Sequence, residues 1–171
     1  MARDFDLLHA YWHSLADGDV PDHDLVDPGS VLDLLPYLMI VEFEEAPFRV
    51  RYRLSGSKLD YVSNIDLTGR YLDEFAVDLG PDGENDPDGP RNQAVATLIG
   101  LYMACRDMRK PVYGVYGWPD KNGYLRPVEV AMFPLLVRGE IRQCLALEYY
   151  GFDPARGPSA PALDPRLPVF D

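Results

Sequence analysis

The stretch that most constrains the fold is FRVRYRLSG, residues 48–56, in which apolar side chains alternate with arginines. Successive side chains of a β-strand point to opposite faces, so this order requires a strand with one buried face and one basic face. We expect Val50, Tyr52 and Leu54 to point to the helix-covered side of a sheet, with the arginines on its outer side. The chain must therefore supply neighbouring strands and a covering layer.

Turn residues and apolar periodicity divide the rest of the chain into elements. Strands are expected at residues 37–44 and 48–55, joined as a hairpin, and at 111–118, 124–137 and 141–150. Helical spacing predicts a helix over 4–17, a short one from Asp27 that ends before Pro36, short helices between 56 and 80, and a longer helix from Pro90. The prediction is an α+β fold, in which a five-stranded antiparallel sheet carries helices on one face, plus an N-terminal amphipathic helix.

Length and composition suggest one domain with extensions, since single domains commonly have about 100–200 residues. The expected division is an N-terminal helical extension at 1–26, the domain itself at 27–150, and a C-terminal tail at 151–171. That tail is rich in proline, as expected for an extended arm.

The charge balance excludes several classes of partner. The chain has 28 acidic and 16 basic residues, for a formal net charge of −12. Phosphate-rich nucleic acids and anionic membranes would repel such a surface, so neither is an expected partner. No apolar run approaches the roughly 20 residues that cross a bilayer. The chain has only two cysteines, Cys105 and Cys144, too few for a disulfide framework, and we expect a soluble cytoplasmic protein.

Three short sequence motifs resemble those of a known family: LLPYLMIVEFE, YRLSGSKL and IDLTGRYLDEF. The strand end at Tyr52–Gly56 and the turn Asp66–Arg70 resemble those of PAS domains, and in particular a bacterial subfamily of short stand-alone PAS proteins. The resemblance covers roughly residues 27–150. It implies a sensory or docking module that binds small molecules between sheet and helices, pairs with other PAS domains, or does both.

The resemblance also says where cofactor residues would lie. Flavin photosensors of this fold use a reactive cysteine in the short helices after the hairpin, and no cysteine lies between Gly56 and Gly80. Haem-binding relatives take a histidine from the long helix, whereas His9, His13 and His23 all precede the matched region. Haem and flavin are therefore disfavoured and no cofactor is predicted, while a small organic ligand is left open.

Metal and catalytic sites are not expected either. His9 and His13 stand at i, i+4 but have no obvious third ligand. The acidic loop that contains Glu84, Asp86 and Asp88 lacks the closing glutamate of a calcium loop. No residue forms a recognisable nucleophile or acid–base pair, so the chain is not expected to be an enzyme.

A ligand site is predicted in the interior between sheet and helices. Several phenols converge there in the expected fold, which is how an apolar cavity with polar tips is built. The alternative is that these side chains simply fill the core. The candidate residues are Tyr52, Leu54, Tyr61, Arg70, Tyr102, Tyr113 and Tyr116.

The arginines need a role as well. Glu129 and Glu148 lie in otherwise apolar strands, and a buried carboxylate should be paired. We expect Arg51 and Arg53 to pair with them or with Glu42 across the sheet.

The N-terminal helix carries an apolar stripe of Phe5, Leu8, Trp12 and Leu15. This stripe needs a surface on its own sheet or on another protomer, and a homodimer interface is the preferred interpretation.

The overall expectation is a stand-alone signalling module that docks onto other proteins, possible partners including PAS-containing ones, and that senses a small ligand. A ligand sensor without a docking role is the first alternative. An enzyme of unknown reaction is the second.

Overall fold

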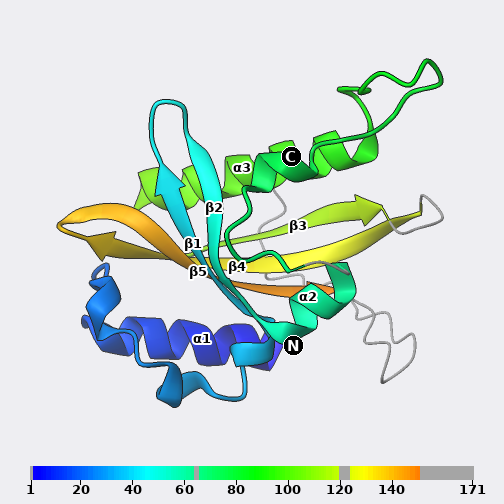
Figure 1. Cartoon of the computed structure of the whole chain (residues 1–171). Coiled ribbons are helices and arrows are strands. Elements are labelled where there is room, and N and C mark those ends of the chain that lie inside the picture. The colour runs from blue at the N-terminus through cyan, green and yellow to red at the C-terminus, as the bar shows by residue number, and fades with distance from the viewer. Residues whose placement is uncertain (1, 64–65, 120–123, 151–171) are drawn as a thin grey trace.

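The computed structural model describes residues 2–63, 66–119 and 124–150. Its centre is the expected five-stranded antiparallel sheet, with strands in the order β2-β1-β5-β4-β3 (Figure 1). The strands are β1 (Leu38–Glu44), β2 (Arg49–Ser55), β3 (Val112–Pro119), β4 (Leu125–Val137) and β5 (Glu140–Tyr150). The fold predicted from the alternating stretch is confirmed.

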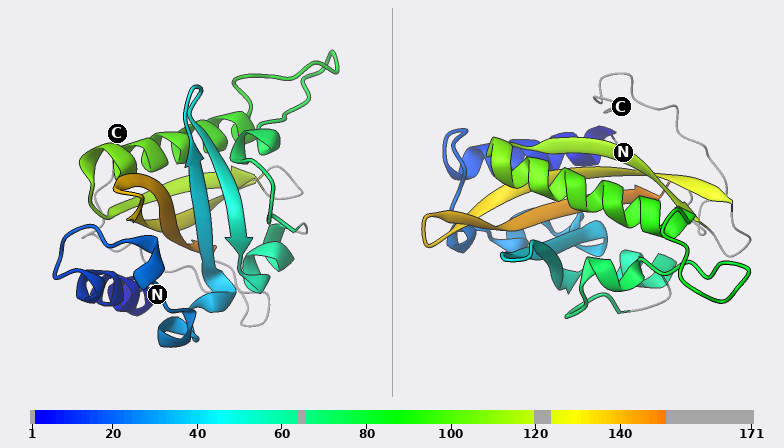
Figure 2. Two further views of the ribbon diagram at one scale, coloured as in Figure 1. Left: turned by 60° about the vertical axis from the view of Figure 1, so that its left-hand side comes forward. Right: turned by 90° about the horizontal axis from the view of Figure 1, so that it is seen from above.

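Helices cover both faces of this sheet (Figures 1 and 2). The long helix α3 (Pro90–Met108) covers one face, together with the 3-10 turn η4 (Leu72–Phe75), while α2 (Ser57–Ser63) follows the end of β2. The N-terminal helix α1 (Ala2–Leu15) lies against the other face. We call these the α3 face and the α1 face.

Helix α1 is held to its own sheet. Phe5, Leu8 and Trp12 are buried and Leu15 is half-buried. The indole Nε1 of Trp12 donates a hydrogen bond to the carbonyl of Pro134 in β4 at 2.8 Å, and its ring lies 6.2 Å from that of Phe133. The apolar stripe of α1 therefore packs within the chain, which corrects its assignment to a homodimer interface. Phe5, Leu8, Trp12 and Val20, from the part predicted as an extension (1–26), share one hydrophobic core with the domain.

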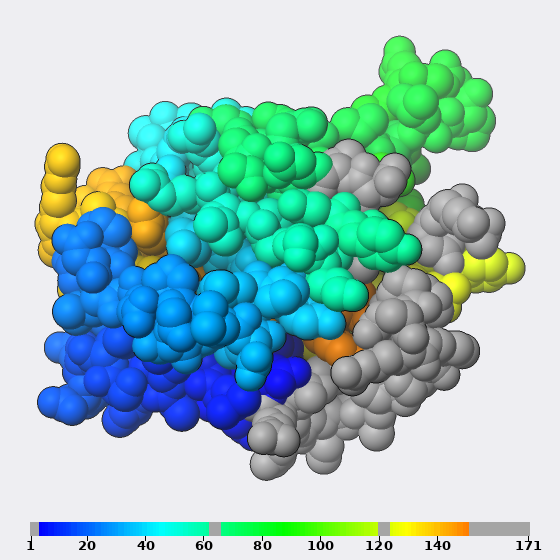
Figure 3. All heavy atoms as spheres, turned by 60° about the horizontal axis from the view of Figure 1, so that its bottom comes forward, coloured from blue at the N-terminus to red at the C-terminus, as the bar shows by residue number. Residues whose placement is uncertain are grey.

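The segment after α1 forms three 3-10 turns where one short helix was expected. These are η1 (His23–Leu25), η2 (Pro28–Val31) and η3 (Leu35–Tyr37). Asp27 caps η2 as predicted, because its side chain accepts a hydrogen bond from the amide of Gly29 at 2.9 Å. Gly29 and Pro36 both disfavour a continuous helix, so the chain turns again at each of them. Together with α1 the turns form the blue part of the face seen in Figure 3.

The hairpin of β1 and β2 contains a bulge that changes the expected alternation. Ile40 pairs with Leu54, but the next residue, Val41, pairs with Tyr52, so Arg53 is the extra residue. Val50 and Tyr52 are buried as predicted. Leu54 lies beyond the bulge and is 44% exposed, which corrects the prediction that it lines the interior.

The turn DLTGR brings the chain back along the free side of β2. The side chain of Asp66 accepts a hydrogen bond from the amide of Thr68, and Gly69 takes a φ of 85°, which favours glycine. The amide of Gly69 then donates to the carbonyl of Tyr52 at 2.7 Å, and the amide of Tyr52 donates to the carbonyl of Arg70 at 2.9 Å. Residues 69–71 therefore cover β2 with main-chain hydrogen bonds.

Helix α3 approaches the sheet closely at β3. A Cβ atom added to Gly114 would lie 2.7 Å from the Cδ1 atom of Leu101, so the glycine is what allows α3 to sit this near. No helix in the described part of the chain is long and apolar enough to cross a membrane. The predicted tail, 151–171, lies outside the described residues.

Candidate functional site

The most unusual chemistry of the molecule lies on the α3 face, where a carboxylate is buried among tyrosines. Glu148 of β5 is 3% exposed. Tyr116 of β3 donates a hydrogen bond to its Oε1 atom at 3.0 Å, and Tyr150 of β5 donates to its Oε2 atom at 2.7 Å. Burial raises the pKa of Glu148, and the two phenol hydrogen bonds partly oppose that rise. Two neutral phenol groups therefore donate the hydrogen bonds that satisfy this carboxyl group.

Two further tyrosines complete the cluster. Tyr102 of α3 is fully buried, and its ring meets that of Phe43 edge-on at 5.9 Å. Burial raises the pKa of Tyr102, and the neighbouring Tyr52 raises it further. Burial also raises the pKa of Tyr52, with a smaller contribution from the charge of Glu148. We call Tyr52, Tyr102, Tyr116, Glu148 and Tyr150 the tyrosine–glutamate cluster.

The hydroxyl of Tyr102 is the anomaly in this cluster. It is buried, and it has no hydrogen-bond partner among the atoms that the structure describes. A buried hydroxyl left unpaired costs about 1–3 kcal/mol, and most buried polar groups are paired for that reason. Among the described residues the hydroxyl of Ser55, at the end of β2, is also buried without a partner, but Tyr102 is the member of the cluster that could pair with a group from outside the chain.

Sequence reasoning anticipated only part of this cluster. Tyr52, Tyr102 and Tyr116 were predicted to face the interior, and the structure brings these three together with Glu148. Tyr150 was missed. Its signal was present, because Glu148 and Tyr150 are two residues apart on one strand and so share a face.

The other predicted ligand residues lie elsewhere. Tyr61 on α2 is 69% exposed. Arg70 is exposed and forms an ion pair with Glu74, one helical turn further along, while its guanidinium lies 5.4 Å from the ring centre of Phe75. Leu54 is turned outward by the bulge in β2. None of these three side chains is placed in the tyrosine–glutamate cluster.

Tyr113 lies on the α1 face, three residues before Tyr116 in the same strand. Its hydroxyl is 2.6 Å from the Nδ1 atom of His9, and its ring packs edge-on against Phe133. Burial, with a smaller contribution from Asp6, raises the pKa of Tyr113 to about 12. Residues three apart on a strand point to opposite faces, so Tyr113 and Tyr116 could not share one interior.

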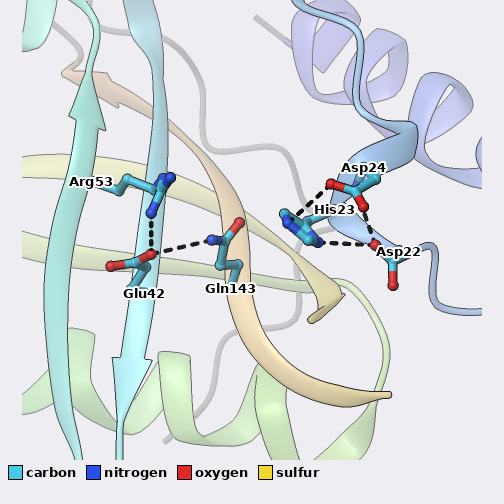
Figure 4. A network of polar contacts seen from close by, with 6 residues as sticks. All are labelled: Asp22, His23, Asp24, Glu42, Arg53 and Gln143. Atoms are coloured by element: carbon cyan, nitrogen blue, oxygen red, sulfur yellow. Dashed lines mark hydrogen bonds and ion pairs between the residues drawn. The ribbon is translucent and has the colours of Figure 1, made fainter. Parts of the chain in front are cut away.

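Arg51 and Arg53 of β2 make ion pairs on the opposite side of the sheet. The Nη1 atom of Arg53 lies 2.5 Å from Glu42, which also accepts a hydrogen bond from Gln143 (Figure 4). Arg51 lies 3.9 Å from the same carboxylate. The pairing of both arginines with Glu42 agrees with the prediction.

The predicted pairing with Glu129 or Glu148 is corrected. Glu148 bonds tyrosines on the α3 face, whereas Arg51 and Arg53 extend from the other face of β2. Glu129 is buried in β4 and shares the α1 face with Phe133, four residues along the strand. The two acids therefore belong to opposite faces of the sheet. Glu129 is on the same face as Arg51, but β1 and β5 lie between its strand and β2.

Arg49 has a different acidic partner, which the sequence did not indicate. Its Nε and Nη2 atoms donate to the two carboxylate oxygens of Asp73 at 2.7 and 2.8 Å, and its guanidinium lies 3.7 Å from the centre of the Tyr71 ring. The hydrogen bond from Arg49 lowers the pKa of Asp73. This contact fastens η4 to the edge of β2.

One cluster in the described residues has the composition of a metal site, Asp22, His23 and Asp24 (Figure 4). Nδ1 of His23 lies 2.9 Å from the Oδ1 atom of Asp22, and Nε2 lies 3.2 Å from that of Asp24. Each ring nitrogen therefore already faces a carboxylate. Asp22 also caps η1 through the amide of Asp24, so hydrogen bonding within the turn accounts for the cluster.

Comparison with known proteins bears on the family. Residues 3–77, which run from α1 to just after η4, match the model of a PAS domain family. This part of the chain resembles the PAS domain family. This confirms the resemblance, while assignment to a bacterial subfamily stays a prediction. The match begins within α1, so the helix that covers the α1 face lies inside the PAS match. PAS domains act in sensing and docking, which places the chain among signalling modules.

Solved structures similar to this chain include photoreceptors. The photo-excited blue-light photoreceptor Vivid is 17% identical, with a TM-score of 0.45 over 66% of this chain and 76% of that chain. A light-state dimer of the fungal photoreceptor Vivid is 16% identical, with a TM-score of 0.45 over 66% and 75%. A Light-Oxygen-Voltage domain studied with a flavin analogue is 14% identical, with a TM-score of 0.49 over 78% and 89%. No curated protein matches the chain.

These comparisons correct the prediction that no cofactor is bound and that flavin is disfavoured. The similar structures include a Light-Oxygen-Voltage domain that was studied with a flavin analogue. The prediction rested on the absence of a cysteine between Gly56 and Gly80. That cysteine serves the photochemistry of a flavin, whereas holding a ring depends on the polar and aromatic groups of the interior. A missing cysteine therefore does not exclude flavin.

Proposed function

We propose that this PAS module is a signalling component that binds a small ligand at the tyrosine–glutamate cluster and passes the change on by docking to another protein. The observation that carries the proposal is the buried hydroxyl of Tyr102, which has no partner in the described part of the chain. A ligand that supplies this partner gains a hydrogen bond at a group already removed from water. Core filling alone gives no reason to bury a phenol where phenylalanine would pack as well.

The neighbouring groups define the chemistry of the ligand. Glu148 accepts hydrogen bonds, Tyr102 offers a hydroxyl, and the rings of Phe43, Tyr52 and Phe75 form edge-on contacts around them. A planar heteroaromatic molecule with a donor beside an acceptor on one edge matches these groups. A flavin has such an edge, and Tyr102 and Glu148 are the residues that would hold it.

The position of the cluster suggests how binding is transmitted. Glu148 and Tyr150 lie at the C-terminal end of β5, which is the central strand of the sheet. The other face of β5 belongs to the layer under α1, because Leu145 pairs with Phe133 and that ring contacts Trp12. A change in the hydrogen bonds of Glu148 therefore acts on the strand that links both faces.

The proposal includes no enzymatic activity and keeps the cytoplasm as the compartment. Glu148 is buried and already accepts hydrogen bonds from Tyr116 and Tyr150, which suits recognition better than proton exchange with a substrate. Both cysteines are free and buried, as is common in a reducing compartment.

The test is the substitution Tyr102→Phe, which removes only the unpaired hydroxyl. We expect native mass spectrometry to find a small molecule on the protein purified from cells, and flavin mononucleotide to serve as the first added probe. Tyr102→Phe should weaken binding about 3- to 10-fold, the value of one hydrogen bond. Without ligand, its thermal stability should stay equal or rise, because no hydrogen bond is lost.

Tyr113→Phe is the matched control, since it makes the same change on the α1 face and should leave binding unchanged. A protein that carries no small molecule and binds no flavin mononucleotide would refute the proposal. So would equal effects of the two substitutions on binding.

A further inference from the structure

Strand β3 is the edge strand of the sheet opposite β2. In the part of the chain that the structure describes, only β4 pairs with it, and the register of this pairing has no bulge over Val112–Pro119. In an antiparallel sheet about half of the main-chain groups of an edge strand point away from their neighbour. Proteins usually protect such edges with charges, bulges or inserted prolines. The strand VYGVYGWP has no charged residue, and its proline is its last residue.

The flank of α3 beside this edge is also uncharged. Leu101 meets Gly114 of β3, whereas Arg106 reaches Glu45 after β1, so these residues mark the two sides of the helix. At about 100° per residue, Thr97, Ala104 and Met108 share the side of Leu101, with Gly100 next to them. Thr97, Gly100 and Met108 are exposed. We call Thr97, Gly100, Ala104 and Met108 the α3 flank.

The lack of charge on β3 and on the α3 flank is exceptional for this chain. Its formal net charge is −12, yet α3 has no charged residue between Arg91 and Arg106, although part of that stretch faces solvent. Exposed apolar helix surface next to an unpaired strand marks an interaction site. An anionic membrane would be repelled by the rest of the molecule, so the partner is a protein.

We propose that β3 and the α3 flank form the interface of a homodimer, in which β3 pairs antiparallel with β3 of a second copy. An uncharged strand can lie beside its own copy without repulsion, and a two-fold axis is the commonest symmetry of a homodimer. The paired strands lie about 4.8 Å apart and join the two sheets into one.

The same arrangement accounts for the small residues of α3. Each α3 lies over its own β3, so the two-fold axis that pairs the strands also brings the two helices side by side. Helices pack at about 8–10 Å, and small side chains allow the closer distances. Gly100 has open space around it in the single chain, and a Cβ atom added there meets nothing within 4 Å. The glycine is therefore not required by packing within one copy.

The experiment is Gly100→Glu, measured by sedimentation velocity over a concentration series of the full chain. The open space and the higher helix propensity of glutamate both favour folding of the variant. We expect the dissociation constant of the dimer to rise at least about tenfold, because like charges then face each other across the axis. Leu54→Glu is the matched control, since it adds the same charge to an exposed position on β2 and should leave the dimer intact.

Hydrogen exchange of the native chain gives an independent measurement. The β3 amides that point away from β4 should exchange faster on dilution, while the covered amide of Tyr52 should not change. A chain that stays monomeric, a dimer that survives Gly100→Glu, or β3 protection that appears only after a different protein is added would each overturn the proposal. Ligand binding at the tyrosine–glutamate cluster is not needed for any of these outcomes.

Discussion

The two edge strands of the sheet, β2 and β3, differ in charge, in regularity and in what covers their free side. Strand β2 is basic, has a bulge and is covered by the main chain of residues 69–71. Strand β3 is uncharged and regular, and in the described residues it has no neighbour beyond β4. The difference shows that one edge is closed by the chain itself, whereas the other is suited to a second chain. Exposure of apolar residues alone would not distinguish them, since Leu54 of β2 is exposed as well.

The largest expected loss of stability comes from a substitution directly after β2, the edge strand that the chain covers. A Cβ atom added at Gly56, directly after β2, would lie 2.4 Å from the carbonyl oxygen of Pro36 and 2.5 Å from that of Leu35. Main-chain atoms cannot move aside as a side chain can, so Gly56→Ala should cost about 3 kcal/mol or more of unfolding free energy. Urea denaturation measures this cost. Gly100→Ala, in open space on α3, is the control and should stabilise by about 0.5–1 kcal/mol.

A smaller loss of stability is expected from substitutions at Gly69, in the turn whose main chain hydrogen-bonds to β2. Gly69 has a φ of 85° and open space around it, so the strain of substitution comes from the backbone alone. Gly69→Val should cost about 1–2 kcal/mol and speed the exchange of the Tyr52 amide. Gly69→Asn should cost less, because asparagine tolerates positive φ. Equal costs for valine and asparagine would show that the backbone conformation of this turn is not what holds the edge closed.

The smallest effect concerns the charged contact that fastens η4 to β2. The hydrogen bond from Arg49 lowers the pKa of Asp73 below its ordinary value of 3.8. A group with a lowered pKa contributes stability above its unfolded-state pKa, and loses it as the pH falls through the folded-state pKa. Asp73→Asn should therefore destabilise modestly at neutral pH, with a difference from the native chain that shrinks in acid below about pH 3.8.

Urea denaturation over a pH series tests this dependence. The double variant Arg49→Met with Asp73→Asn should lose no more stability than the sum of the single variants, and less if the pair is coupled. A difference that stays constant from neutral to acid pH would rule out the ion pair as its source.

Much of the fold could be read from local pattern. The alternation in residues 48–54 placed Val50 and Tyr52 inside, and the turn residues marked the five strands closely. The turn DLTGR was recognised as a turn from Asp66 and Gly69, and the structure shows the same residues shaping it. Such features depend on a few consecutive residues, so their physical causes are present in the sequence itself.

The candidate site was less predictable, because it depends on the face to which each strand residue turns. The bulge at Arg53 moved Leu54 outward, and no neighbouring residue signals it. Glu129 and Glu148 looked equivalent, yet the pairings of Glu129 with Tyr149 and of Val130 with Glu148 put them on opposite faces. Tyr113 and Tyr116 could have been separated from sequence, because three residues is an odd spacing on a strand.

Hydrophobic periodicity and turn residues were enough to identify the elements and their order, and the PAS-like motifs indicated the family. Each of these signals reflects interactions between residues close along the chain. The partners of charged and phenolic groups were decided by tertiary structure. Glu148 bonds Tyr116 across the sheet and Arg49 reaches Asp73. Within the described residues β2 is covered, while β3 pairs with β4 alone. These contacts join residues far apart in sequence, and strand register and helix packing determine which of them meet.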